Sequence, residues 1–226
     1  MKKLVFVLVL ILAVAGFSQL KAEAQTQRVV RFKSSINPGA LLTDVRDQFG
    51  KSILEPILGF GVINNSVKCQ NNSNSMSQVL GSDSQRIYVD NPKAAYDGWT
   101  LTIAPEDGLN AKWQSQDSSE FDYNDGAEGG CIDSDNDGSA GLMAIDPSNA
   151  KINSDCLECS KNHITVGSVE KQSFSEHQSV TLLKANGQAD ELGSWYMTGI
   201  DVEQTIPPGQ EGGNYIIDMV LTATAT

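Results

Sequence analysis

The pattern of apolar and polar residues predicts β-strands along most of the chain after its first 24 residues. Short runs rich in β-branched and aromatic residues are separated by Gly, Pro, Asn and Asp, which is typical of strands joined by turns. The predicted strands cover residues 29–32, 57–63, 86–89, 99–103, 163–169, 179–185, 195–202 and 215–224. No segment carries a long apolar stripe with the helical period of 3.6 residues.

The alternation is clearest in two of these segments. Trp99, Leu101 and Ile103 fall on one face of the first, with threonines on the other, and residues 215–224 alternate in the same way. Each pattern indicates an antiparallel strand with one buried face. About eight such strands without helical crossovers predict an all-β fold, an antiparallel β-sandwich or a related Greek-key barrel.

The first 24 residues have the pattern of a secretory signal peptide. Lys2 and Lys3 precede an apolar run from Leu4 to Phe17, which at 14 residues is shorter than the roughly 20 that a membrane span needs. Residues 22–24 (Ala-Glu-Ala) then place small residues where a signal peptidase reads them. We expect a signal peptide at 1–24 and one exported domain at 25–226 without a transmembrane segment; a retained membrane anchor is the alternative.

The net charge of the chain indicates which kinds of partner it can bind. The 226 residues include 16 Lys+Arg and 28 Asp+Glu, a formal net charge of -12. A negative surface disfavours nucleic acid and anionic membranes as partners, whereas cations or basic surfaces suit it.

Four cysteines lie in the exported part: Cys69, Cys131, Cys156 and Cys159. An even number on an exported chain favours disulfides, and the sequence leaves all three pairings open. Cys156 and Cys159 form a CxxC motif, which can present two sulfurs to one metal or close a local disulfide. Since no second CxxC accompanies it, structural disulfides are the favoured interpretation.

A change of composition between about residues 110 and 162 predicts a loop insertion in the β domain. Gly, Ser, Asp and Asn crowd together there, and three of the four cysteines fall in this range. From Glu106 to Asp146 there are eleven acidic residues and one basic residue, Lys112. Such like charges repel one another unless water solvates them, as in a flexible loop, or cations neutralise them.

The acidic residues at 133–138 (Asp-Ser-Asp-Asn-Asp-Gly) predict a calcium site. Carboxylates at positions 1, 3 and 5 of a turning loop converge on one side, and the glycine at position 6 permits a sharp bend. Position 12 is Ala144 instead of the Glu of an EF-hand, and no amphipathic helix flanks the loop. The motif resembles the DxDxDG loops of thrombospondin type 3 and other extracellular calcium modules. The candidate ligands for Ca²⁺ are Asp133, Asp135, Asp137, Asp146, Asp122 and Asp125; a disulfide at Cys131 would tie the loop to the domain.

Several segments in order resemble WxL-domain proteins. Residues 87–90 and 97–103 are similar to the first signature of that family, and residues 37–41 followed by 60–61 to its opening segment. Residues 206–209 and 212–222 lie where the family has its second Trp-x-Leu; here Leu221 and Ala223 take those positions. The resemblance implies an exported surface protein that attaches non-covalently to peptidoglycan or another cell-wall polymer, often together with other surface proteins. The candidate wall-binding residues are Trp99, Leu101, Tyr215 and Leu221, and the alternative for Trp99 is a core residue.

Enzymatic motifs do not occur. The only histidines, His163 and His177, lie outside any HExxH or nucleophile-partner arrangement, and there is no GxSxG elbow. We therefore expect a non-catalytic cell-surface protein that binds wall polymer or a surface partner and has a calcium-stabilised loop. One alternative is a pilin-like structural subunit that self-associates through the strand at 215–224; a secreted hydrolase that uses two carboxylates is the other.

Overall fold

Antiparallel β-strands dominate the computed structural model, which describes residues 39–64, 68, 74–92, 98–157, 159–187 and 192–225. This arrangement confirms the predicted all-β class. Two short 3₁₀ helices also occur there, η1 (Gly108–Asn110) and η2 (Ala127–Gly129). The strands are β1 (Leu42–Arg46), β2 (Ser75–Leu80), β3 (Arg86–Asn91), β4 (Gly98–Pro105), β5 (Trp113–Ser115), β6 (Glu120–Phe121), β7 (Leu142–Asp146), β8 (Lys151–Ser154), β9 (Ile164–Val166), β10 (Gln172–Ser173), β11 (Val180–Asn186), β12 (Gly193–Thr198), β13 (Ile200–Thr205), β14 (Tyr215–Ile216) and β15 (Met219–Ala225).

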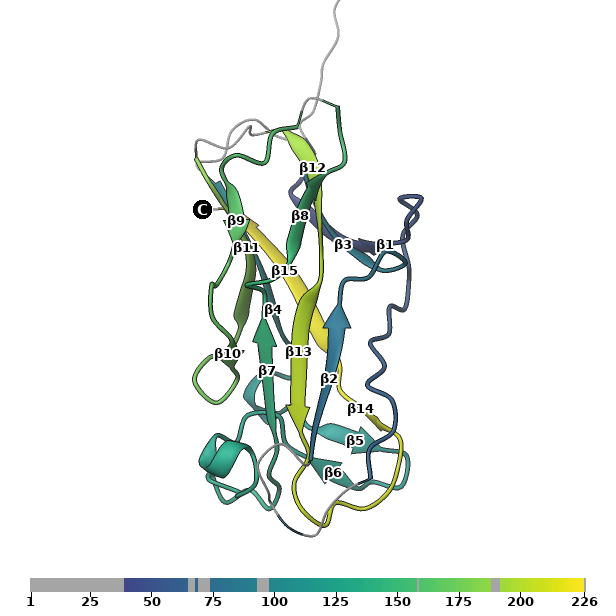
Figure 1. Ribbon diagram of the computed structural model, residues 1–226, viewed down its shortest axis with the longest axis vertical. Helices are drawn as coiled ribbons and strands as arrows, with labels where there is room; N and C mark the ends of the chain where they lie inside the picture. Colours follow the sequence, from purple (N-terminus) through teal and green to yellow (C-terminus); the bar gives the residue numbers. More distant parts are fainter. Residues whose placement is uncertain are drawn as a thin grey trace, which may run out of the picture. The chain divides into compact units, whose positions relative to one another are not determined.

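Two of the sheets join end to end into one layer. Their strand orders are β1-β3-β12-β8 and β10-β7-β13-β2, so β2 continues into β3, β7 into β8 and β12 into β13 (Figure 1). The bend between them falls at Gly81 and Gly199, whose φ angles of 78° and 82° favour glycine. The N–H of Gly199 donates to the carbonyl of Gly81 at 2.8 Å, which keeps neighbouring strands together through the bend.

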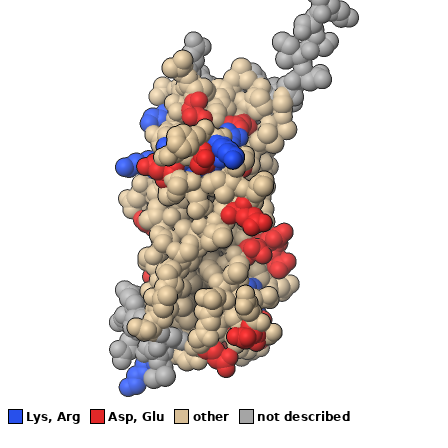
Figure 2. Space-filling model, turned by 90° about the vertical axis from the view of Figure 1, so that its right-hand side faces the viewer, with Lys and Arg blue, Asp and Glu red and all other residues tan. Residues whose placement is uncertain are grey.

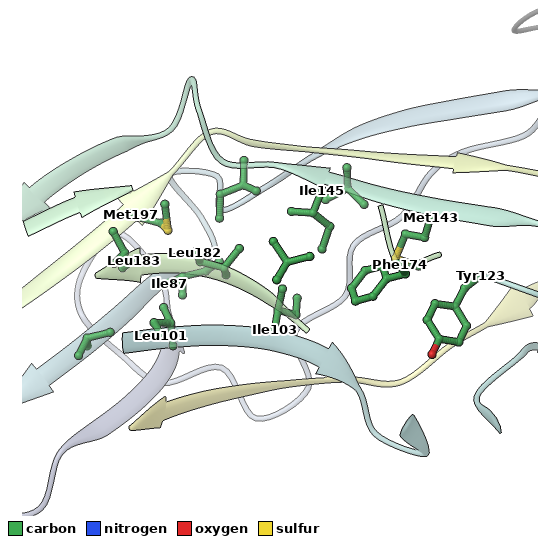
Figure 3. Close-up of a cluster of buried hydrophobic side chains, with 14 of the residues drawn as sticks. Ile87, Leu101, Ile103, Tyr123, Met143, Ile145, Phe174, Leu182, Leu183 and Met197 are labelled. Atoms are coloured by element: carbon green, nitrogen blue, oxygen red, sulfur yellow. The ribbon is translucent and has the colours of Figure 1, made fainter. Parts of the chain in front are cut away.

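A second layer packs against the first, and the hydrophobic core lies between them. Its strand order is β15-β4-β11-β9. Figure 3 shows Ile145 of β7 and Ile103 of β4 on opposing ribbons, with their side chains in the space between. The rings of Trp99 (β4) and Trp195 (β12) lie 5.8 Å apart, and both are buried. The two layers therefore form a β-sandwich.

A small third sheet, β14-β5-β6, lies at the lower end of the molecule in Figure 1. Trp113 of β5 stacks on Phe121 of β6 with ring centroids 5.6 Å apart, and Phe121 also contacts Tyr215 of β14. The segment that contains Asp122 and Asp125 follows β6 directly, so this sheet positions those two acidic residues.

The predicted alternation in 99–103 and 215–224 is confirmed, because odd-numbered side chains of β4 are buried and residues 219, 221 and 223 of β15 are less exposed than residues 220, 222 and 224. The strand predicted at 215–224 is divided into β14 and β15 by residues 217–218. The strand predicted at 57–63 is wrong. That segment is irregular, since Pro56 precedes it and Gly61 adopts a φ of 79°. The strand predicted at 195–202 divides at Gly199 into β12 and β13. The strand predicted at 29–32 lies outside the described residues.

Part of the range predicted as a loop insertion, 110–162, is regular structure. It contains β5 to β8, of which β7 pairs with β13 and β8 pairs with β12. The irregular part runs from the end of β6 to the start of β7 and holds the acidic motif. None of the described helices is long or apolar enough to cross a bilayer.

Candidate metal centre

Five aspartates come together between β6 and β7. Asp122 and Asp125 directly follow β6, and Asp133, Asp135 and Asp137 belong to the loop at 133–138, which we call the aspartate loop. Ligand oxygens of Asp122, Asp135 and Asp137 lie within 4.8 Å of one another, and so do those of Asp125, Asp133 and Asp135. Since Asp135 belongs to both groups, the five side chains form one cluster, the five-aspartate cluster.

The aspartate loop curls around its first residue. The Oδ1 atom of Asp133 accepts a hydrogen bond from the N–H of Asn136 at 2.6 Å, and its Oδ2 accepts one from Gly138 at 2.9 Å. Asn136 and Gly138 have φ angles of 64° and 96°, in the region that Gly and Asn tolerate best. The bend predicted at the glycine is therefore confirmed.

Backbone contacts fix the aspartate loop against the segment after β6. Asp122 N–H donates to the carbonyl of Ala140, and Asp125 N–H donates to that of Gly141, both at 2.9 Å. Gly141 has a φ of 139°, and a Cβ atom there would lie 2.1 Å from the carbonyl oxygen of Asp122. Only glycine allows this approach, so Gly141 helps to bring the two groups of acids together.

Burial makes Asp122 a weak acid. The residue is 2% exposed, and desolvation is the main cause that raises the pKa of its carboxyl to about 6. The nearby charges of Asp137 and Asp125 add to this increase in pKa, and a hydrogen bond from the N–H of Tyr123 opposes it. The position of Asp122 is fixed through its backbone, because the buried side chain of Gln204 donates to its carbonyl at 3.3 Å. Without a cation, the ionised form of Asp122 is therefore disfavoured.

Asp125 has one buried oxygen without a partner. Its side chain is also 2% exposed, and its Oδ1 accepts hydrogen bonds from the N–H and the hydroxyl of Ser134 at 3.0 and 2.6 Å. Its Oδ2 is buried and has no hydrogen-bond partner among the described residues. A buried, unpaired carboxylate oxygen is costly, and a bound cation would remove that cost.

Lys112 neutralises one side of the five-aspartate cluster. Its Nζ lies 2.7 Å from Oδ2 of Asp137 and 3.4 Å from Oε1 of Glu120. Desolvation is the largest single influence and lowers the pKa of Lys112, but the hydrogen bonds and charges of Asp137 and Glu120 together raise that pKa above its usual value. Desolvation likewise opposes ionisation of Asp137, but Lys112 and Ser139 lower its pKa. Asp137 thus has a cationic partner within the protein.

The donors of the five-aspartate cluster suit a hard cation. Both groups consist of carboxylates alone, with no His or Cys among them. Carboxylate oxygens favour Ca²⁺, Mg²⁺ or Mn²⁺ over ions that prefer nitrogen and sulfur ligands. The unpaired oxygen of Asp125 and the raised pKa of Asp122 both fit such an ion.

Asp146, predicted as a further ligand, belongs to neither group. It lies at the far end of β7, four residues beyond Leu142, which corresponds to about 13 Å along a strand. Its Oδ1 accepts a hydrogen bond from the N–H of Ser148 in the turn between β7 and β8. The sequence proximity of Asp146 to the aspartate loop was misleading, because β7 carries it away.

The predicted wall-binding residues lie in the core or at its edge. Trp99 and Leu101 are 2% and 0% exposed, so neither presents a side chain to a polymer. Tyr215 and Leu221 are half-buried, and the Tyr215 hydroxyl donates to the carbonyl of Glu211 at 2.7 Å. The contact role for Trp99 and Leu101 is therefore wrong, and the alternative of a core tryptophan is correct.

The CxxC motif forms a local disulfide between Cys156 and Cys159. Next to it, the carbonyl of Ser160 accepts the hydrogen bond of the buried Trp195 indole at 3.0 Å. Cys131, two residues before the aspartate loop, is also disulfide-bonded. Cys69 lies outside the described residues.

Sequence reasoning missed three residues that support the five-aspartate cluster: Lys112, Ser134 and Gln204. Lys112 had a signal, since it is the only base among eleven acidic residues. Ser134 and Gln204 had none, because a serine and a distant glutamine acquire their roles only through the fold.

No family model, curated protein or solved structure matches this chain. Its function is therefore inferred from the residues of the site and from the surface around them.

Proposed function

We propose that the protein is an exported, non-catalytic cell-surface protein whose five-aspartate cluster binds Ca²⁺. The observation that carries this proposal is the buried Oδ2 of Asp125, which has no hydrogen-bond partner among the described residues. The carboxylates of Asp133 and Asp135 lie close to the Asp125 side chain and could share an ion with it. The ion would be held by Asp122, Asp125, Asp133 and Asp135, while Asp137 is shared with Lys112. Bound calcium would link the aspartate loop to the segment after β6.

Three features support calcium as the ion and the outside of the cell as the location. The ligands are carboxylates from two segments, and extracellular calcium modules with such sites bind with a Kd of about 10⁻⁴ to 10⁻³ M. Disulfides at Cys131 and between Cys156 and Cys159 suit an oxidising compartment. The signal-peptide pattern of residues 1–24 agrees with export.

The proposed partner is a cell-wall polymer such as peptidoglycan, or another surface protein. The resemblance to WxL-domain proteins supports this partner. Because Trp99, Trp113 and Trp195 are all buried, polymer binding would use other surfaces than tryptophan faces. Calcium would act on such binding by ordering the aspartate loop.

Sedimentation of the exported protein with insoluble peptidoglycan, in calcium and in EDTA, tests this function. We expect pelleting with the polymer in calcium and less in EDTA. Asp135→Ala with Asp137→Ala removes the calcium dependence, whereas Asp117→Ala with Glu128→Ala, two exposed acids of the same stretch, keeps it. Failure to pellet in either condition would exclude peptidoglycan as the partner. Release of soluble sugars from the polymer would contradict a non-catalytic role.

A subunit role in a filament or layer is the second candidate, because an apolar groove opens along the edge of the sandwich.

A further inference from the structure

An apolar groove of about 590 Å³ opens between the two layers on the side of β2 and β15. Both strands are sheet edges: among the described strands, β2 pairs only with β13, and β15 pairs only with β4. The buried core residues Ile103, Met143 and Val202 form part of the groove lining. Leu80, Met219 and Leu221, which are half-buried, also line it. A sandwich that leaves core residues accessible at an edge has room for a further extended segment.

In the described part of the chain, no strand lies along this groove between its two walls. β1 lies beside β3 in the first layer, and the segment that follows, residues 52–64, contains no strand. This segment forms one wall, where Gln78 Nε2 donates to the carbonyl of Gly59 at 2.7 Å and Phe60 packs against Trp113. Ile57, which also lines the groove, is 73% exposed.

The charged residues along the groove are acidic. They are Glu55, Glu106 and Asp218, all exposed, and among the described residues no Lys, Arg or His lines the groove. Figure 2, which views the right-hand side of Figure 1, shows acidic residues beside an uncharged surface and most basic residues toward the upper end. A segment that fits should therefore be apolar on one face and basic on the other.

One segment of this chain has that composition. Residues 25–37, which lie outside the described residues, contain three basic residues (Arg28, Arg31 and Lys33) and no acidic residue. In an extended conformation Val30, Phe32 and Ile36 would share one face, with Arg28 at its start, and Arg31 and Lys33 would share the other face with Val29. Fully extended, these 13 residues span about 43 Å. The segment therefore has a net charge opposite in sign to that of the groove, and Val30 and Phe32 supply adjacent apolar side chains on one face.

We propose that the groove of one copy binds residues 25–37 of a second copy as an added strand along the edge of β15. Main-chain hydrogen bonds to a free strand edge give affinity in such complexes, and side-chain pockets give specificity. The described chain enters β1 next to Asn91, at the end of β3, and Gly39 lies against Pro92 there. The groove begins further along β1, near Val45, and extends away from Asn91. Since each copy carries one donor segment and one groove, repeated binding of the donor of one copy in the groove of the next generates an open chain of copies. This assembly goes beyond the calcium function and does not depend on it.

Sedimentation velocity of the exported protein over a range of concentrations tests the proposal. We expect oligomers that grow with concentration. Val30→Asp with Phe32→Asp removes the apolar face of the donor and should weaken self-association at least tenfold. The thermal unfolding temperature should be unaltered at a dilution at which both proteins are monomeric, and it should be lower than that of the unchanged protein at concentrations at which the unchanged protein is assembled.

Reversing the charge of the three acidic groove residues tests the proposal independently of the donor variant. Glu55→Lys, Glu106→Lys and Asp218→Lys together should also weaken association at least tenfold. The matched control, Asp155→Lys with Glu170→Lys and Glu176→Lys, changes the net charge by the same amount at exposed positions outside the groove and should assemble like the unchanged protein.

Mixing the two defective variants gives the decisive result. The donor-defective copy retains a groove and the groove-defective copy retains a donor, so an equimolar mixture should form dimers and nothing larger. A protein that stays monomeric at all concentrations, or a donor-defective variant that assembles like the unchanged protein, would overturn the proposal. Running all samples in calcium and in EDTA keeps this outcome separate from that of the calcium site.

Discussion

At the scale of single residues, two buried carboxylates define the site, and each is unfavourable in its ionised form without a cation. Asp122 has a raised pKa because burial disfavours its charge, and Asp125 has an oxygen without a partner. A cation bound by the carboxylate oxygens would stabilise the charge of Asp122 and would give the Asp125 oxygen a partner. Asp137 differs because Lys112 already lies against it.

The raised pKa of Asp122 predicts a specific pH dependence. In EDTA the folded protein holds this proton more tightly than the unfolded chain, whose pKa is near 3.8, so the free energy of unfolding should fall as the pH rises from about 4 to about 6. Calcium needs the ionised carboxylate, so calcium affinity should fall about tenfold per pH unit below about 6. Urea denaturation in EDTA and calcium titration, each at several pH values, measure the two effects.

Asp122→Asn is the matched variant for this dependence. It should lose the stability change between about pH 4 and pH 6 in EDTA, while the exposed Asp117→Asn should retain it. If Asp122→Asn shows the same pH profile as the unchanged protein, another group is responsible.

At the scale of elements, the return of the chain from the aspartate loop into β7 depends on one glycine. Gly141→Ala should lower the free energy of unfolding by at least about 2 kcal/mol, because a Cβ atom would lie 2.1 Å from the carbonyl oxygen of Asp122 and φ is 139°. Gly212→Ala, where an added Cβ meets nothing within 4 Å, should change it by less than about 0.5 kcal/mol. Urea denaturation of both variants measures this; equal stabilities would show that the close approach is not required.

Some strands were predictable from the sequence and others were not. β4 was predictable, because its alternate side chains face a core on one side only. The segment 57–63 is as apolar as a strand but is irregular, since proline and left-handed glycine interrupt its backbone. β2 (Ser-Met-Ser-Gln-Val-Leu) escaped prediction because it is an edge strand with one partner and few apolar residues. All five members of the five-aspartate cluster were among the six predicted ligands. The sixth, Asp146, lies apart from them because of the direction of β7.

At the scale of the whole molecule, Trp99 and Trp195 join the two layers of the sandwich. Trp99→Ala should lower the free energy of unfolding by about 3–5 kcal/mol, because it leaves a cavity beside Trp195. Val169→Ala, at a side chain that is 80% exposed, serves as the control and should change stability by less than about 0.5 kcal/mol. A Trp99→Ala variant as stable as the unchanged protein would show that this tryptophan does not hold the two layers together.

The central claim is that a cation satisfies the buried carboxylates of the five-aspartate cluster, and calorimetric titration of the ion-free exported protein with Ca²⁺ tests it most directly. We predict one site per chain with a Kd of about 10⁻⁴ to 10⁻³ M. Asp125→Asn should weaken it at least tenfold, and Asp117→Asn should leave it unchanged. The absence of calcium binding up to 10 mM, or equal binding by Asp125→Asn, would contradict the account.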